Sequence, residues 1–267
     1  MKIASLAFLA LFFFSTNCVA AEIRLYGAGS LREAMTEMAE QFHKATGDTV
    51  EVSFGHSGKM REKAEQPGTA DIFTSADMGH AQKLQKDGRA TFVAEFARNS
   101  LCLIGTPATG INDGNVLEKM LDPALTLGVF PPIEDPCGDY TVEMFKRANA
   151  LISDAESRLM GKAVTIKPDM VRGKIAEGEN YTLALLREST IDLHVGYCSG
   201  ARMRLQAAYP ELLVAELPQE LRVGANYGLT VLKDAKPEAY KMALFILSQK
   251  GQGILKKFGF TPVGMTD

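Results

Sequence analysis

The feature that most constrains the fold is a repeated unit, in which a short apolar strand runs through a glycine-containing turn into a helix. In the first copy, residues 23–26 alternate like a strand, and Gly-Ala-Gly-Ser at residues 27–30 forms the turn. Similar units follow at residues 49–65, 126–150 and 178–187. This rhythm predicts an α/β fold with doubly wound, mostly parallel sheets, whose ligands bind beyond the carboxyl ends of the strands.

Two serines occupy equivalent places in these turns. Ser30 follows the first strand, Ser57 follows the second, and each stands at the start of a predicted helix. The first amides of a helix lack partners within the helix and carry the positive end of its dipole, so such turns attract small anions. Each serine can therefore cap its own helix or donate its hydroxyl to a bound guest. Asn180 is the expected cap in the fourth unit.

The N-terminus predicts export. Lys2 precedes an apolar run over residues 3–14, and small residues end at Ala20 and Ala21, as in a secretory signal peptide cleaved after one of these two alanines. The run is short for a membrane span. We therefore expect residues 1–21 to be removed and residues 22–267 to form one large domain or two lobes in the periplasm.

Composition argues against several functions. The net charge is −3, or −4 once Lys2 is lost, without long blocks of one sign, so we expect no nucleic-acid partner. The chain has four histidines and lacks a Gly-x-Ser-x-Gly elbow, which disfavours a hydrolase and, with it, an enzyme. Cys102, Cys137 and Cys198 match no zinc spacing, and the sequence leaves their pairing open.

Six segments, taken together and in order, resemble the periplasmic molybdate-binding proteins of ABC importers, within the type II periplasmic solute-binding proteins. They are Gly-Ala-Gly-Ser-Leu at 27–31, Phe-Gly-His-Ser at 54–57, residues 70–77, residues 135–140, Gly-Glu-Asn at 178–180 and Val-Gly-Tyr at 195–197. The resemblance implies a two-lobed fold. Lobe 1 would hold residues 22–100 and 228–267, lobe 2 residues 105–225, and hinge strands would lie near 101–104 and 226–232.

The resemblance also implies the site and its guest, a molybdate or tungstate oxyanion held between the lobes. The ligand-binding residues would be Ser30, Ser57 and Tyr197 through their hydroxyls, and Cys137 and Tyr181 through backbone amides at or beside them. Additional pocket residues would be Gly29, His56 and Asp139. The family implies no cofactor, no free metal cation, a membrane ABC permease as partner, and a monomer.

Several residues depart from the family pattern. Gly27 and Gly29 replace alanines, His56 replaces a small residue, Cys137 replaces alanine, and Tyr181 replaces a small aliphatic residue. If these side chains turn inward, the pocket suits another guest. The alternative function is therefore a solute-binding protein of the same fold for sulfate, phosphate, a small carboxylate or a metal complex.

Overall fold

The computed structural model describes residues 21–175 and 179–264. The predicted signal peptide, apart from Ala21, and Gly178 lie outside these residues. Within the described ranges, none of the helices combines the length and the apolar character that crossing a bilayer would need.

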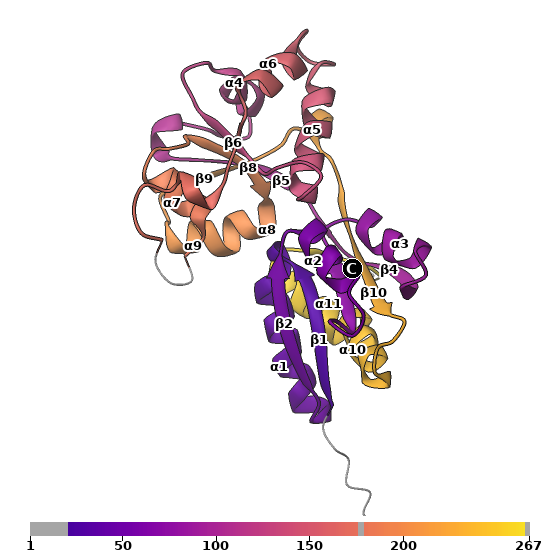
Figure 1. Cartoon of the computed structure of the whole chain (residues 1–267). Helices are drawn as coiled ribbons and strands as arrows, with labels where there is room; N and C mark the ends of the chain where they lie inside the picture. Colours follow the sequence, from indigo (N-terminus) through magenta and orange to yellow (C-terminus); the bar gives the residue numbers. More distant parts are fainter. Residues whose placement is uncertain (1–20, 176–178, 265–267) are drawn as a thin grey trace, which may run out of the picture.

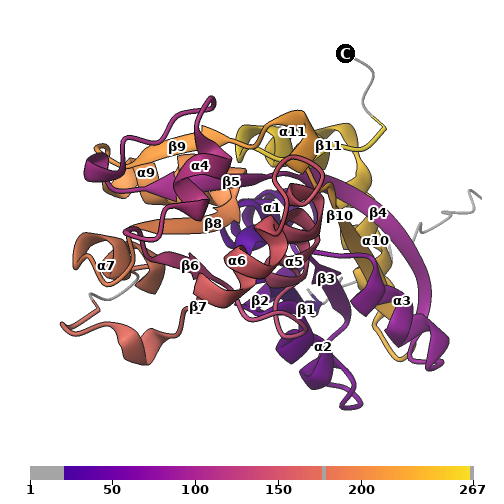
Figure 2. The ribbon, with the colours of Figure 1, turned by 90° about the horizontal axis from the view of Figure 1, so that it is seen from above.

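The described residues form two lobes, each built on a sheet flanked by helices (Figure 1). In lobe 1, the described residues form a six-stranded sheet in the order β11-β4-β10-β3-β1-β2. Helices α1, α10 and α11 contact one another, while α2 and α3 form a second group (Figure 2). The strands are β1 Glu22–Ala28, β2 Thr49–Gly55, β3 Ile72–Ser75, β4 Ala90–Asn99, β10 Ala225–Leu232 and β11 Thr261–Pro262. The helices are α1 Arg32–Thr46, α2 Ser57–Ala64, α3 Gly79–Lys86, α10 Pro237–Leu247 and α11 Gln249–Lys257.

Lobe 2 is built on a sheet in which the described residues supply five strands, in the order β7-β6-β8-β5-β9. Its strands are β5 Leu101–Gly105, β6 Leu127–Val129, β7 Val164–Thr165, β8 Leu193–Tyr197 and β9 Leu213–Glu216. Its helices are α4 Val116–Leu121, α5 Pro136–Ala148, α6 Ala155–Lys162, α7 Tyr181–Arg187, α8 Cys198–Gly200 and α9 Gln206–Ala208. A π-helical segment, Ala201–Leu205, joins α8 to α9.

The α/β two-lobed fold predicted from the sequence is confirmed, but both sheets are mixed rather than mostly parallel. Strand β1 pairs parallel with β2 and β3, whereas β10 runs antiparallel to β3 and β4. In lobe 2, β6 pairs parallel with β7 and β8, and β5 runs antiparallel to β8 and β9. Strands β5 and β10 are those by which the chain enters each sheet from the other lobe, without a crossover helix.

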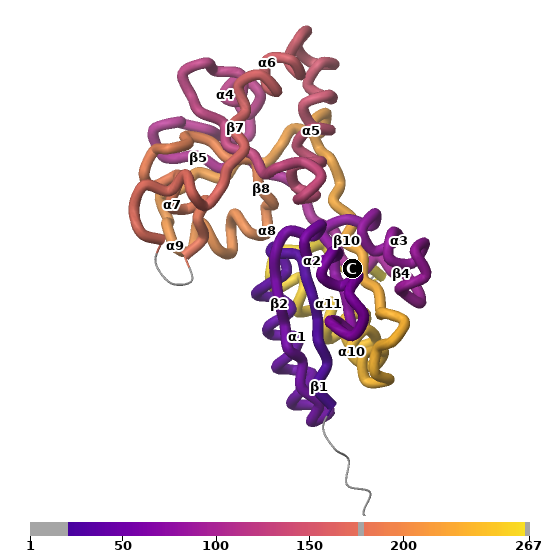
Figure 3. The backbone as a smooth tube through the Cα atoms, in the orientation of Figure 1, coloured from indigo at the N-terminus to yellow at the C-terminus, as the bar shows by residue number. Residues whose placement is uncertain are grey.

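The passages between the lobes lie beside the expected hinge strands. Residues 101–104 lie inside β5 of lobe 2, and residues 226–232 lie inside β10 of lobe 1. The chain instead changes sheets at Ser100 and between Glu216 and Ala225 (Figure 3).

The largest cluster of buried apolar residues runs through both lobes, and the first helix shows how the sequence specifies its part in lobe 1. The face of α1 that carries Ala34, Met35, Met38, Ala39 and Phe42 is buried, as the helical spacing of these residues predicts. Gly47 ends this helix in the left-handed conformation, with φ of 83°. The apolar face thereby fixes α1 against the sheet and places Ser30, just before the helix, at the edge facing lobe 2.

The structure settles the cysteine pairing that the sequence leaves open. Cys102 on β5 forms a disulfide with Cys198 at the start of α8, with Cα atoms 5.0 Å apart. Cys137 is a free, buried thiol. The disulfide ties β5 to the residue that follows Tyr197 at the end of β8.

Candidate ligand-binding site

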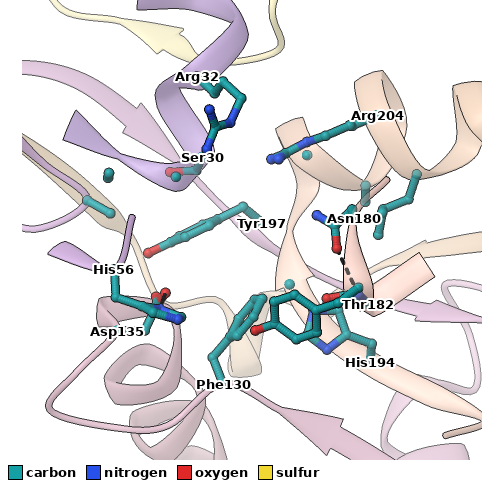
Figure 4. A pocket seen from close by; sticks show the side chains of 18 of the residues that line it. Ser30, Arg32, His56, Phe130, Asp135, Asn180, Thr182, His194, Tyr197 and Arg204 are labelled. Atoms are coloured by element: carbon teal, nitrogen blue, oxygen red, sulfur yellow. Dashed lines mark hydrogen bonds and ion pairs between the residues drawn. The ribbon is translucent and has the colours of Figure 1, made fainter. Parts of the chain in front are cut away.

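A cavity of about 530 Å³ lies between the lobes, beyond the carboxyl ends of β1, β2 and β8 (Figure 4). Lobe 1 contributes the turns after β1 and β2, and lobe 2 contributes the start of α7, the end of β8 and the π-helical segment. The polar and predicted residues on its wall are Gly29, Ser30, Arg32, Glu33, His56, Ser57, Asp135, Glu179, Asn180, Tyr181, Thr182, His194, Tyr197 and Arg204. The position of the cavity is the one that the strand-turn-helix rhythm predicts.

The lobes touch along one rim of this cavity. The Gly58 amide donates to the Glu134 carbonyl at 3.3 Å, and the Lys59 ammonium lies 3.1 Å from the Glu134 carboxylate. The Tyr140 hydroxyl donates to the Ala76 carbonyl at 3.3 Å. A Cβ atom on Gly58 would lie 3.2 Å from the Glu134 carbonyl oxygen, so glycine permits the close approach of α2.

Neither predicted serine caps its helix. The Ser30 hydroxyl lies 3.0 Å from the Tyr227 hydroxyl, and the Ser57 hydroxyl accepts a hydrogen bond from the Ala76 amide at 3.1 Å. The Asn99 side chain donates to Tyr227 at 3.3 Å, so Tyr227 can donate to Ser30. Both serines line the cavity and can direct their own hydroxyl protons toward a guest.

Two buried hydroxyls on the cavity wall have no hydrogen-bond partner among the described residues. They belong to Tyr197, which is 8% exposed, and to Thr182, which is 1% exposed. Figure 4 shows the Tyr197 hydroxyl between Ser30 and the pair formed by His56 and Asp135. Burial raises the pKa of Tyr197 well above its usual value, so this hydroxyl is a proton donor at neutral pH. A buried donor without a partner is costly, which makes these two groups natural contacts for a guest.

The start of α7 brings Tyr181 to the same wall. The Asn180 side chain accepts from the Thr182 amide at 2.8 Å, as expected for a helix cap. The Tyr181 ring contacts Phe130 edge-on, with ring centroids 6.3 Å apart. Burial, followed by the nearby Asp135 charge, raises the pKa of Tyr181, so its hydroxyl is also protonated at neutral pH.

Two predicted residues do not line the cavity. The Cys137 amide donates to the Asp135 carboxylate at 2.9 Å, and its thiol is buried against the Val195 carbonyl. The Asp139 carboxylate accepts from the Ile133 amide at 2.9 Å and lies outside the cavity. The physical reason is that Asp135, directly before a proline, caps α5 and takes the amide that an anion would otherwise contact.

The cavity wall carries charged groups that contact one another across the lobes. His56 Nδ1 lies 2.5 Å from the Asp135 carboxylate, and Arg204 Nε lies 3.4 Å from the Glu33 carboxylate. Arg204 Nε is buried and makes no hydrogen bond to the described residues. The Arg32 guanidinium lies over the Phe54 ring, 5.0 Å from its centroid. An anion in this cavity therefore meets both cationic and anionic side chains.

His194 lies at the base of the cavity and is 2% exposed. Burial lowers its pKa to about 4, although the hydrogen bond with the Gly128 carbonyl opposes this shift. Its ring contacts Phe130 edge-on at 5.0 Å. His194 is therefore a neutral wall residue at physiological pH. Among the described residues, no group of three or more His, Cys, Asp or Glu side chains is arranged to hold a metal ion.

Sequence reasoning missed several polar wall residues, among them Thr182, Asp135, His194 and Arg204. Asp135 carries a usable signal, because aspartate before proline at a strand-to-helix turn is typical of a helix cap. Thr182 and His194 lie next to recognised motif residues but carry no pattern of their own. Arg204 has no local signal, since only the packing of lobe 2 against lobe 1 brings it to the cavity.

Comparison with known proteins identifies relatives along almost the whole chain. Residues 23–261 match the bacterial extracellular solute-binding proteins. The uncharacterized protein PM1146 of Pasteurella multocida is 32% identical over 248 residues, which cover 91% of this chain and 100% of that protein. The molybdate-binding protein ModA of Escherichia coli K12 is 26% identical over 248 residues, covering 90% and 89%. The resemblance to molybdate-binding proteins is thereby confirmed.

Solved structures share the fold at lower identity. The periplasmic molybdate-binding protein of Azotobacter vinelandii has a TM-score of 0.71 at 19% identity and covers 90% of this chain and 99% of its own. The sulfate-binding protein SubI of Mycobacterium tuberculosis H37Rv has a TM-score of 0.74 at 15% identity, covering 91% and 88%. PEB3 bound to L-phospholactate has a TM-score of 0.69 at 15% identity, covering 90% and 100%. The chain belongs to the bacterial extracellular solute-binding proteins.

Proposed function

We propose that this protein binds a tetrahedral oxyanion between its lobes, with molybdate or tungstate as the first candidates, and delivers it to a membrane ABC permease without chemical change. The observation that carries the proposal is the buried Tyr197 hydroxyl, which lacks a partner among the described residues and faces the cavity beside Ser30. The ModA relatives supply the choice of molybdate. No cofactor is needed for this role.

Neutral hydroxyls suit a fully deprotonated oxyanion. Tyr197, Ser30 and Ser57 can each donate one proton to the guest, and hydrogen bonds to a charged acceptor are shorter and stronger than those to a neutral one. The Ser57 hydroxyl already accepts from Ala76, so its own proton is free to point into the cavity. In a dry cleft these donors hold the charge without an ion pair.

The predicted signal peptide and the family's extracellular character support export to the periplasm. There the closed lobes would present the guest to the permease as a monomeric receptor. Closure around a ligand is a usual transition for two-lobed binding proteins.

A larger organic anion is the second candidate, and the cavity volume favours it. A tetrahedral oxyanion occupies on the order of 100 Å³, the share of three or four water molecules. The cavity of about 530 Å³ leaves room for more, and the Arg204 guanidinium on its wall, which already lies 3.4 Å from the Glu33 carboxylate, is a cationic group that a second acidic group would meet. The fold accommodates such a guest in PEB3, whose solved structure holds L-phospholactate.

Thermal unfolding of residues 22–267 separates these candidates. The ligands are molybdate, tungstate, sulfate, phosphate and phosphoglycolate, each added at increasing concentration. A ligand at 100 times its dissociation constant adds about 2.7 kcal/mol, which corresponds to a rise of about 5–10 °C for a chain of this size. Shifts with molybdate and tungstate alone support the first candidate, and a shift confined to phosphoglycolate supports the second. No shift with any of the five refutes the proposal.

A further inference from the structure

His56 and Asp135 form a contact that joins the lobes inside the cavity wall. His56 precedes Ser57 at the start of α2 in lobe 1, and Asp135 caps α5 in lobe 2. The ring Nδ1 lies 2.5 Å from one carboxylate oxygen, while the other accepts from the Cys137 amide at 2.9 Å. The two side chains are only 27% and 16% exposed. Water therefore screens this pair less than a surface ion pair.

The contact differs from the other polar contacts between the lobes. Lys59 and Glu134 are more than half exposed, and lysine and glutamate are both charged between pH 5 and 8. Arg204 and Glu33 also line the cavity, and neither residue type changes charge in that range. Histidine does change charge there. Among these contacts, only the one between His56 and Asp135 contains a residue type that changes charge in this range.

The Asp135 carboxylate is placed to affect a bound anion. After burial, its charge is a smaller cause of the raised pKa values of Cys137, Tyr181 and Tyr197, because it lies near these groups around the cavity. Burial, the main cause in each case, raises the pKa of the cysteine and of both tyrosines and lowers that of His194 across the Phe130 ring, so all four groups are neutral between pH 5 and 8. None of these neighbours can compensate the Asp135 charge. Only a proton on His56 makes this part of the wall neutral overall.

We propose that His56 and Asp135 form a proton-dependent latch, so that closing the lobes around an anion takes up a proton at His56. The proposal rests on the proposed function, because it concerns the same cavity and an anionic guest. With His56 protonated, the ion pair draws α2 and α5 together and cancels the carboxylate charge that would repel the guest. With His56 neutral, both effects are lost. The pair thus sets the pH range in which the receptor holds its anion.

The sign of the pH dependence follows from linkage. If binding takes up one proton, the association constant falls by up to about tenfold for each unit that the pH rises. Two variants separate this mechanism from a merely structural contact. Asp135→Asn keeps a good helix cap for α5 and removes the charge. His56→Gln keeps a hydrogen-bond donor but cannot be protonated.

The experiment is isothermal titration calorimetry with molybdate at pH 6.5, 7.5 and 8.5, in two buffers of different protonation enthalpy. We expect the wild type to take up as much as one proton and to lose affinity as the pH rises. Asp135→Asn should bind tightly with no pH dependence, and His56→Gln should bind weakly with none. His80→Gln, which replaces a histidine of α3 outside the cavity, should match the wild type. A flat wild-type profile, or an equal loss in both pair variants, would overturn the proposal.

If molybdate does not bind, that result counts against the proposed function. A measurement without ligand then still tests the latch. Small-angle X-ray scattering reports the radius of gyration of the open and closed forms. We expect the wild type to expand between pH 6.5 and 8.5, and His56→Gln to be expanded at both pH values. A wild-type radius that does not change with pH, and that equals that of His56→Gln, would overturn the latch independently of any ligand.

Discussion

Replacing Tyr197 with phenylalanine should change stability and affinity in opposite directions. The Tyr197 hydroxyl is buried without a partner among the described residues, so the ligand-free protein bears the cost of an unsatisfied donor. Phenylalanine removes that cost and keeps the ring, whose centroid lies 5.8 Å from that of Tyr227. The same change deletes a donor that an anion would use. We therefore expect a more stable ligand-free protein that binds its guest more weakly.

The two effects have comparable magnitudes. A buried, unpaired hydroxyl costs about 1–3 kcal/mol, so the free energy of unfolding of the ligand-free variant should rise by up to that amount. The unfolding midpoint should rise by about 2–4 °C for each kcal/mol. A hydrogen bond to a charged acceptor contributes about 1.5–3 kcal/mol, which corresponds to a loss of affinity of about 10- to 150-fold.

Denaturant unfolding without ligand and calorimetric titration with molybdate measure the two quantities. Tyr227→Phe is the matched control, because the Tyr227 hydroxyl lies within hydrogen-bond distance of Ser30 and Asn99. Its removal leaves partners unsatisfied in a buried site and should lower the free energy of unfolding by about 1–3 kcal/mol. The reasoning about Tyr197 is refuted if Tyr197→Phe is less stable than the wild type and binds molybdate equally well.

Three further predictions follow from single contacts. Ser57→Ala should leave the Ala76 amide unpaired and so lower the free energy of unfolding by about 1–3 kcal/mol. It should also weaken molybdate binding, measured by calorimetry, about tenfold or more. Unchanged values of both quantities would contradict the assigned contacts. Because burial lowers the pKa of His194 to about 4, the unfolded chain binds a proton there that the folded chain does not, so the free energy of unfolding falls by about 3 kcal/mol between pH 6.5 and 4. His194→Gln should lose less stability on acidification in denaturant titrations, and an equal loss would contradict this. Reducing the disulfide between Cys102 and Cys198, which are 96 residues apart, should lower the free energy of unfolding by about 2–5 kcal/mol. Denaturant titrations with and without reductant measure this loss, and coincident unfolding curves would contradict the prediction.

The order of strands and helices could be predicted because the signals are local. A period of two or of 3.6 residues is visible within a single segment, and the buried face of α1 agrees with its spacing. The sequence pattern does not show which sheet each of these strands joins, because β4 and β5 follow one another almost without a break. What separates them is Asn99, whose side chain accepts from the Ser100 amide and donates to Ser199, a partner 100 residues away.

Site residues could be predicted from the sequence where their position in a turn after a strand places them on the cavity wall. The places of Ser30, Ser57 and Tyr197 at strand ends bring all three to the cavity wall. Cys137 was a poor prediction for the wall because the Asp135 carboxylate, two residues earlier, accepts the hydrogen bond from its amide. Sequence spacing alone does not show whether this amide donates to the carboxylate or to a bound anion. Arg204 reaches the wall through contacts between the lobes, and no local pattern reports such contacts.

Equilibrium dialysis against molybdate, followed by elemental analysis, tests the central claim most directly. We expect one molybdenum atom per chain for residues 22–267 at neutral pH. The Ser30→Ala, Ser57→Ala, Tyr197→Phe triple variant should bind far less, while its circular dichroism spectrum should match that of the wild type. Equal molybdenum content in wild type and triple variant would show that the anion binds elsewhere. No molybdenum in either would contradict molybdate as the guest.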